Sequence, residues 1–146
     1  MATLAADPKA AARRFVDEVL NRHDLDRLDG VVAEDFVERT PRAGQGPGRE
    51  GFRAMIRGLI EGFPDARWEI LHLIGEGDTA VVRILFTGTH LGPFMGFAPT
   101  GRTVRVSGVH IARVVDGMMV EHWRHVDELD LLEQLGVMEA PAPPAA

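Results

Sequence analysis

The chain has 146 residues, no cysteine and a formal net charge of −6 at pH 7. This length fits one domain, and the acidic balance argues against a nucleic-acid partner, which would need a basic surface to bind phosphates. The lack of cysteine excludes disulfides, thiolate metal sites and a cysteine nucleophile. The first residues contain no long apolar run, so we expect a cytoplasmic protein without a secretory signal or a membrane span.

Apolar residues at helical spacing dominate the first half of the chain. An Asp-Pro pair at residues 7–8 is typical of a helix start, with aspartate as the N-cap and proline at the first helical position. The predicted elements are a helix from Pro8 to about residues 21–23, a short helical piece over 25–36 interrupted by Gly30, an extended segment at 36–41 and a helix over 49–61.

Residues typical of strands follow the Phe-Pro-Asp sequence at 63–65. The predicted strands cover 66–74, 79–90, 103–115 and 118–127, and a closing helix covers 128–134. Helices segregated to one face of an antiparallel sheet define an α+β fold, whose sheet would curl around the helices and leave an apolar cavity at one end. We expect one domain over residues 1–137 and a disordered tail, rich in proline and alanine, over 138–146.

The last two predicted strands form a hairpin that concentrates ionisable residues. An Asp-Gly pair at 116–117 is a strong signal for its turn. Because successive side chains of a strand point to opposite faces, His110 shares a face with Val106 and Gly108. The alternating sets of the second strand are His122, Arg124 and Val126 on one face, and Glu121, Trp123, His125 and Asp127 on the other. Spacing alone does not tell which set lies opposite His110.

Several motifs resemble those of one known family. They are FPD at 63–65, GTHLGPFMGFAPTGR at 88–102, HIARVVDG at 110–117, VEHW at 120–123, and Asp127 with QLG at 134–136. Over about residues 10–137 the chain is similar to the SnoaL-like polyketide cyclases, also called ester cyclases, of the NTF2-like superfamily. The resemblance implies an α+β cone around a hydrophobic pocket, usually in a homodimer or higher oligomer. It also implies ring closure by aldol condensation without a metal or an organic cofactor.

The resemblance further implies roles for the hairpin residues. Cyclases of this family use a histidine on the first hairpin strand, which matches His110, and an aspartate on the second, whose position falls on Arg124. The resemblance places His122, Arg124 and Val126 toward the pocket, with Asp127 at the strand end, where it could turn either way. We therefore expect His110 to move a proton, Arg124 to stabilise oxyanion charge, and His122 or Asp127 to assist.

Each candidate also has a structural interpretation. His110 could be a buried neutral histidine, and His122 a hydrogen-bonding residue of the wall. Arg124 could form an ion pair with Asp127 or Glu128 at the cavity rim, and Asp127 could cap the following helix.

The expected ligand contacts come from strand residues that face the cavity, from its mouth and from the loop at 88–102. They are Phe36, Arg39, Val82, Ile84, Phe86, Phe94, Met95, Val106, Gly108 and Val126. A metal site on His110 and His122 would need a third ligand such as His90, which the spacing does not support, so we expect no metal.

The residues and the resemblance together favour a cofactor-independent enzyme that acts on an apolar, polycyclic small molecule by acid–base chemistry through an enolate. The alternative is a dimer that binds a small molecule or acts as a scaffold without catalysis. Arg124 in the place of the cyclase acid favours that alternative.

Overall fold

A curved five-stranded sheet forms the centre of the computed structural model, which describes residues 6–139 and 141–146. The strand order across this sheet is β1-β5-β4-β3-β2. The elements along the chain are α1 (Pro8–Arg14), η1 (Phe15–Leu20), η2 (Leu25–Gly30), β1 (Val32–Glu38), α2 (Gly48–Gly62), β2 (Arg67–Glu76), β3 (Thr79–Thr89), β4 (Thr103–Val115), β5 (Met118–Val126) and α3 (Glu128–Leu135).

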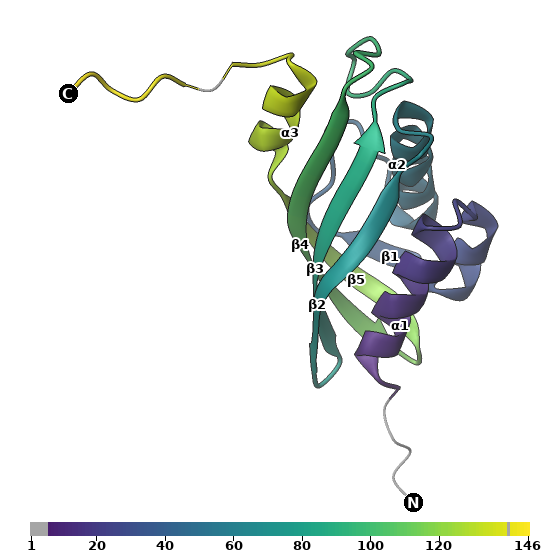
Figure 1. The fold of residues 1–146 in the computed structure, drawn as a ribbon. Coiled ribbons are helices and arrows are strands. Elements are labelled where there is room, and N and C mark those ends of the chain that lie inside the picture. Colours follow the sequence, from purple (N-terminus) through teal and green to yellow (C-terminus); the bar gives the residue numbers. More distant parts are fainter. Residues whose placement is uncertain (1–5, 140) are drawn as a thin grey trace, which may run out of the picture.

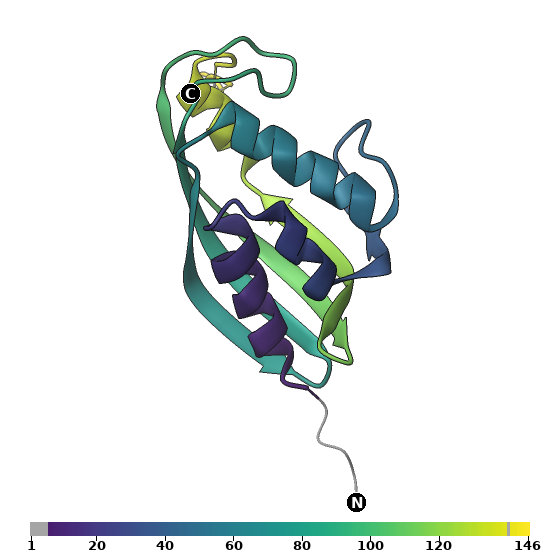
Figure 2. The same ribbon diagram turned by 90° about the vertical axis from the view of Figure 1, so that its right-hand side faces the viewer.

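The helices α1 and α2 cover the same face of the sheet, as Figures 1 and 2 show, so the predicted α+β fold is confirmed. Strands β2 to β5 form the expected antiparallel meander. Aromatic rings join the two layers: Phe15 of η1 and Phe36 of β1 both pack against Phe52 of α2, with ring centroids 5.6 and 4.7 Å apart. Burial of these rings holds the helices against the sheet.

The first helix begins as predicted. The Asp7 side chain accepts a hydrogen bond from the Lys9 N–H at 3.0 Å, and Pro8 occupies the first turn. The helix continues as the π-helical η1 and ends at Leu20, close to the predicted end.

Strand β1 corrects the prediction of a helical piece over residues 25–36. The helical part is the 3-10 helix η2, which ends at Gly30, and residues 32–38 form a strand that pairs in parallel with β5. Val31 and Val32 are completely buried, and their branched side chains favour an extended backbone. Hydrogen bonds with β5, the last strand along the chain, stabilise β1. Local spacing in the sequence cannot reveal so distant a partner.

Two parts of the predicted domain division lie outside the described residues, namely residues 1–5 and residue 140. Disorder of the tail over 138–146 therefore stays a prediction. Within residues 6–139 and 141–146, no helix combines the length and the apolar character needed to cross a membrane.

The loop before α2 is pressed against that helix. A side-chain carbon built on Gly51 would lie 1.7 Å from the carbonyl oxygen of Gly46, so only glycine permits this approach. The same loop carries Arg42, whose backbone N–H donates to the Gln45 side chain at 3.1 Å. The glycine contact therefore fixes where the loop presents its side chains.

We expect Gly51→Ala to lower the free energy of unfolding by about 1–3 kcal/mol, because the new methyl group forces helix and loop apart. Gly58→Ala is the matched control in the same helix, since nothing lies within 4 Å of its added carbon. Urea denaturation of both variants checks this expectation, and equal stabilities would contradict it.

Candidate functional site

The β4–β5 hairpin brings the predicted ionisable residues to the concave face of the sheet. Its turn contains Asp116 and Gly117 with φ angles of 50° and 78°, the left-handed values that a tight hairpin turn requires. His110 lies directly opposite Arg124 in the strand register. His122 lies opposite Ala112, two residues after His110, so the two histidines face the same side of the sheet.

The alternate residues of the hairpin face the other side, as the resemblance implied. Glu121 accepts hydrogen bonds there from Arg113 Nε at 3.0 Å and from Arg39 Nε at 2.6 Å. These two hydrogen bonds hold the pKa of Glu121 below its ordinary value.

A cavity of about 70 Å³ lies between the hairpin and the helices. Its lining includes five of the predicted contacts and the three basic hairpin residues: Ile84, Phe86, Val106, Gly108, Val126, His110, His122 and Arg124. Helix α2 closes the side of the cavity opposite the hairpin with Phe52, Met55 and Leu59. The lining also includes Trp68 of β2 and Arg42. A surface cleft of about 590 Å³ adjoins this cavity, because Arg42, Met55 and Leu59 line both.

A continuous chain of hydrogen bonds leads from His110 and His122 in the cavity wall to the end of β1 and back to the hairpin. His110 Nδ1 lies 3.1 Å from His122 Nε2, and His122 Nδ1 lies 2.6 Å from Glu38 Oε2. The other oxygen of Glu38 accepts from the hydroxyl and the backbone N–H of Thr40, at 2.8 and 3.0 Å. Thr40 Oγ1 in turn accepts from the backbone N–H of Arg124 at 2.6 Å, which ties β1 to the hairpin.

Glu38 is the buried acid of this chain, with a side chain 6% exposed. Burial alone would raise its pKa, but the hydrogen bond from His122, the charge that His122 carries when protonated, and the hydrogen bonds from Thr40 outweigh burial, so the pKa lies below its ordinary value. Glu38 is therefore an ionised carboxylate at neutral pH.

The carboxylate determines the tautomers of both histidines. An ionised carboxylate only accepts, so His122 Nδ1 must donate to it, and the Nε2 of a neutral His122 must then accept from His110 Nδ1. The unprotonated nitrogen of His110 is consequently Nε2. The pKa of His110 lies well below its ordinary value of 6.5, first because burial disfavours its charged form and then because a positive charge on His122, Arg124 or His125 would repel a second one beside it. His110 is thus a neutral base beside the cavity.

Arg124 contributes a fixed positive charge to the same cavity. Its Nη1 donates to Glu128 Oε1 at 2.9 Å, which is one of the two ion pairs that the sequence left open. The guanidinium remains part of the cavity wall, with a side chain 12% exposed.

Asp127 takes the structural role. Its carboxylate accepts from the Asp130 N–H at 3.1 Å and caps α3, and it does not line the cavity. Arg39 also does not line it: its side chain is 51% exposed and binds Glu121 on the outer face, so its expected contact with the ligand stays a prediction. Alternation along β1 explains the position of Arg39, because Glu38 faces inward and its neighbour must face outward.

The remaining predicted contacts lie around the cavity and not directly on it. Phe36 packs behind His122, with ring centroids 6.2 Å apart. Val82 lines an adjoining space of about 30 Å³ that His110 and His122 share. Phe94 and Met95 line the surface cleft, where Phe94 is buried and Met95 is 46% exposed.

His90 lies apart from the other histidines. It is completely buried, stacks on Phe63 with ring centroids 5.3 Å apart, and shares a hydrogen bond with Thr100 at 3.1 Å. In the part of the chain that the structure describes, no group of three or more potential ligands is arranged to hold a metal ion.

Glu38 and Arg42 are the site residues that the sequence did not reveal. Glu38 had a usable signal, since it stands two positions after Phe36 and would share its inward face if residues 32–38 were read as a strand. Arg42 lies in a loop, where no periodicity indicates the direction of a side chain.

Comparison with known proteins identifies the family. The model of the SnoaL-like polyketide cyclase family matches residues 10–135, so the chain belongs to this family within the NTF2-like superfamily. It is 27% identical over 118 residues to the nogalonic acid methyl ester cyclase of Streptomyces nogalater, covering 80% of this chain and 88% of that protein. It is 28% identical over 128 residues to the aklanonic acid methyl ester cyclase AcmA of Streptomyces galilaeus, covering 87% and 89%.

The solved structure of TsrD from Streptomyces laurentii superposes with a TM-score of 0.81 at 31% identity, covering 89% of this chain and 95% of that one.

The low pKa of His110 predicts a loss of stability in acid. In the unfolded chain His110 takes up a proton near pH 6.5, whereas in the folded protein it does so only at a lower pH. Its contribution to the free energy of unfolding is therefore fully present above pH 6.5 and decreases as the pH falls below that value. We expect His110→Gln to flatten the dependence of the unfolding free energy on pH between 7 and 5, by at most about 1.4 kcal/mol per pH unit. His72→Gln, at an exposed histidine, is the control. If the unfolding free energy of His110→Gln depended on pH as steeply as that of the wild type, the lowered pKa of His110 would be refuted.

Proposed function

We propose that this protein is a cofactor-independent enzyme that closes or rearranges a ring in an apolar, polycyclic small molecule by acid–base chemistry. The observation that carries the proposal is the chain from Glu38 through His122 to His110, which presents a neutral imidazole nitrogen beside an apolar cavity. Membership of the SnoaL-like polyketide cyclase family supports the reaction class.

In the proposed reaction His110 Nε2 removes a proton from a carbon next to a carbonyl group. The guanidinium of Arg124 stabilises the resulting enolate oxygen. The enolate carbon then attacks a second carbonyl, and the protonated His110 returns its proton to the new alkoxide, so that no external acid or base is consumed. Such positioned proton transfer contributes roughly 10²–10⁴-fold to a rate.

Glu38 replaces the acid that the hairpin lacks. When His110 takes up a proton, its Nδ1 proton can move to His122, where the Glu38 carboxylate stabilises the positive charge. The carboxylate therefore comes from β1, and Arg124 can bind the oxyanion through donors other than the Nη1 that binds Glu128.

The ligand must occupy both the cavity and the surface cleft. A cavity of about 70 Å³ is smaller than ordinary ligand sites of about 300–1,000 Å³, whereas the adjoining cleft adds about 590 Å³. Movement of Met55 and Leu59, which line both spaces, would join them.

The proposal is tested with aklanonic acid methyl ester and nogalonic acid methyl ester, whose ring closure can be followed by chromatography. We expect His110→Ala to lower kcat by about 10²–10⁴-fold and Glu38→Gln to lower it by a smaller factor, since the amide no longer stabilises a cationic His122. His72→Ala, on the outer face, should retain the wild-type rate. Turnover by His110→Ala at the wild-type rate would refute acid–base catalysis by this residue and favour a binding protein.

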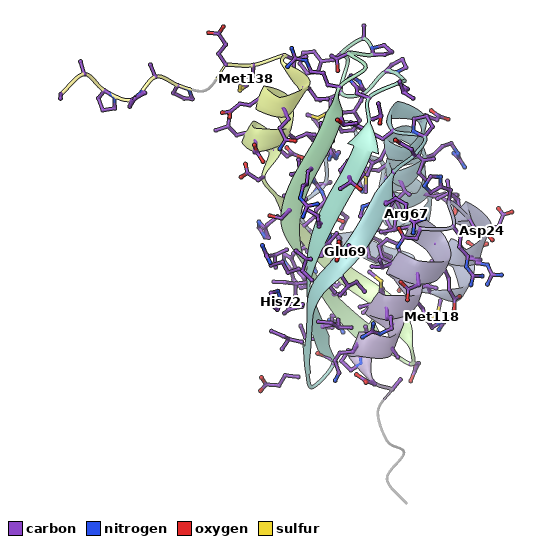
Figure 3. The ribbon with its side chains drawn as sticks, in the orientation of Figure 1. Asp24, Arg67, Glu69, His72, Met118 and Met138 are labelled. Atoms are coloured by element: carbon purple, nitrogen blue, oxygen red, sulfur yellow. The ribbon has the colours of Figure 1, made fainter. Side chains whose placement is uncertain are left out.

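We also propose a homodimer through the uncovered face of the sheet. Four apolar residues form a row across this face, since the strand register pairs Ile74 with Val81, Val81 with Ile111, and Ile111 with Trp123. Ile74 is 62% exposed, and Figure 3 shows His72 projecting from the same strand on the side away from α1. A second copy would cover this row by pairing the two sheets back to back.

We expect Ile111→Glu to produce a monomer, because a charge in the centre of the row opposes its burial. Light scattering after size exclusion gives the mass, with Leu91→Glu as a control at an exposed apolar residue of another surface. A monomeric wild type, or a dimeric Ile111→Glu variant, would contradict the proposal.

A further inference from the structure

Two arginines share one carboxylate where the cavity meets the surface cleft. Arg124 Nη1 donates to Glu128 Oε1 at 2.9 Å, and Arg42 Nη2 lies 3.4 Å from the same oxygen. The three groups together carry one uncompensated positive charge. Glu128 is itself 38% exposed, so solvent weakens the compensation that it provides.

Arg42 has donors that the rest of the described chain does not satisfy. Its Nε and Nη1 atoms are buried without an acceptor among the described residues, and so is Nε2 of Gln45 in the same loop. Buried donors without partners are rare in native proteins. The Phe94 ring, 5.1 Å from the guanidinium carbon, offers only a weak cation–π contact.

Electrostatics at Arg42 agrees with this geometry. Burial and then the charge of Arg124 lower the pKa of Arg42, and the opposing effect of Glu128 is smaller. The guanidinium of Arg42 nevertheless stays charged at neutral pH. A buried positive charge is unfavourable unless a negative group lies beside it.

The position of Arg42 defines how a ligand would lie. Arg42, Met55 and Leu59 line both the cavity and the cleft, and beyond them the cavity is mostly apolar up to His110. A ligand that extends through both spaces would therefore pass the two guanidinium groups where the cavity meets the cleft, and a polar substituent at that point of the ligand would lie against them.

We propose that the natural ligand is a polycyclic carboxylic acid whose free carboxylate binds Arg42 and Arg124 at the mouth of the cavity. A carboxylate is ionised at pH 7 and supplies the single negative charge that the arginine pair lacks, whereas a phenol stays neutral. The inference rests on the proposed function and narrows its substrate class. The two cyclases compared above are named for methyl esters, which carry no charge at this group.

The test compares anthraquinone-2-carboxylate with its methyl ester, by isothermal titration calorimetry on the full chain. We expect the wild type to bind the acid roughly 10- to 100-fold more tightly than the ester, as a charge-assisted hydrogen bond would give. Arg42→Met should remove this preference by weakening acid binding while ester binding changes little. Arg57→Met, at an exposed arginine of α2, should keep it.

A second variant separates loss of charge from loss of fold. Arg42→Lys keeps the charge and should retain part of the acid preference, and circular dichroism establishes that each variant is folded. Equal affinities of the wild type for acid and ester, failure of the acid to bind, or an acid preference that survives in Arg42→Met would overturn the inference.

Because binding is measured without turnover, a catalytically silent protein that prefers the acid would refute only the proposed function. A protein that turns over methyl esters and shows no acid preference would refute only this inference.

Discussion

The rest of the site depends on one constraint, the burial of the Glu38 carboxylate between β1 and the hairpin. An isolated charge there would be strongly unfavourable, so Glu38 must be surrounded by donors. Thr40 and His122 satisfy it, and each of them is thereby held in one orientation. The tautomer of His110 follows from the same requirement. A single buried acid thus determines which nitrogen of each histidine carries a proton, and in which direction each hydrogen bond of the chain runs.

Patterns of alternation and turn chemistry predicted most of the hairpin. The Asp-Gly turn fixes the connection between β4 and β5, and side-chain alternation then separates His110, His122 and Arg124 from the outer residues. The resemblance to the cyclases was needed to choose which set faces inward. Residue types alone could not make that choice, because both faces of the second strand carry ionisable groups.

The acid and the second arginine could not be predicted in the same way. Local spacing over residues 25–36 fits a helix, and only the parallel pairing with β5 makes residues 32–38 a strand. Glu38 lies within the extended segment predicted over residues 36–41, and both Phe36 and Arg39 of that segment were expected to contact the ligand, so the sequence did not settle which of its alternating residues face inward. Arg42 faces the cavity because the loop is held against α2 at Gly51, a contact between positions that no pattern connects.

The parallel pairing of β1 with β5 has a consequence for how the site is assembled. Glu38 and His122 are separated by 84 positions in the chain, and so are Thr40 and Arg124. Closing so long a loop costs conformational entropy before any contact repays it, so such pairings form slowly during folding. During synthesis, β1 leaves the ribosome long before its neighbour in the sheet exists. The carboxylate and the imidazole meet only after nearly the whole domain has been made, and any cut in the chain between them would leave two fragments that each hold half of the proton path.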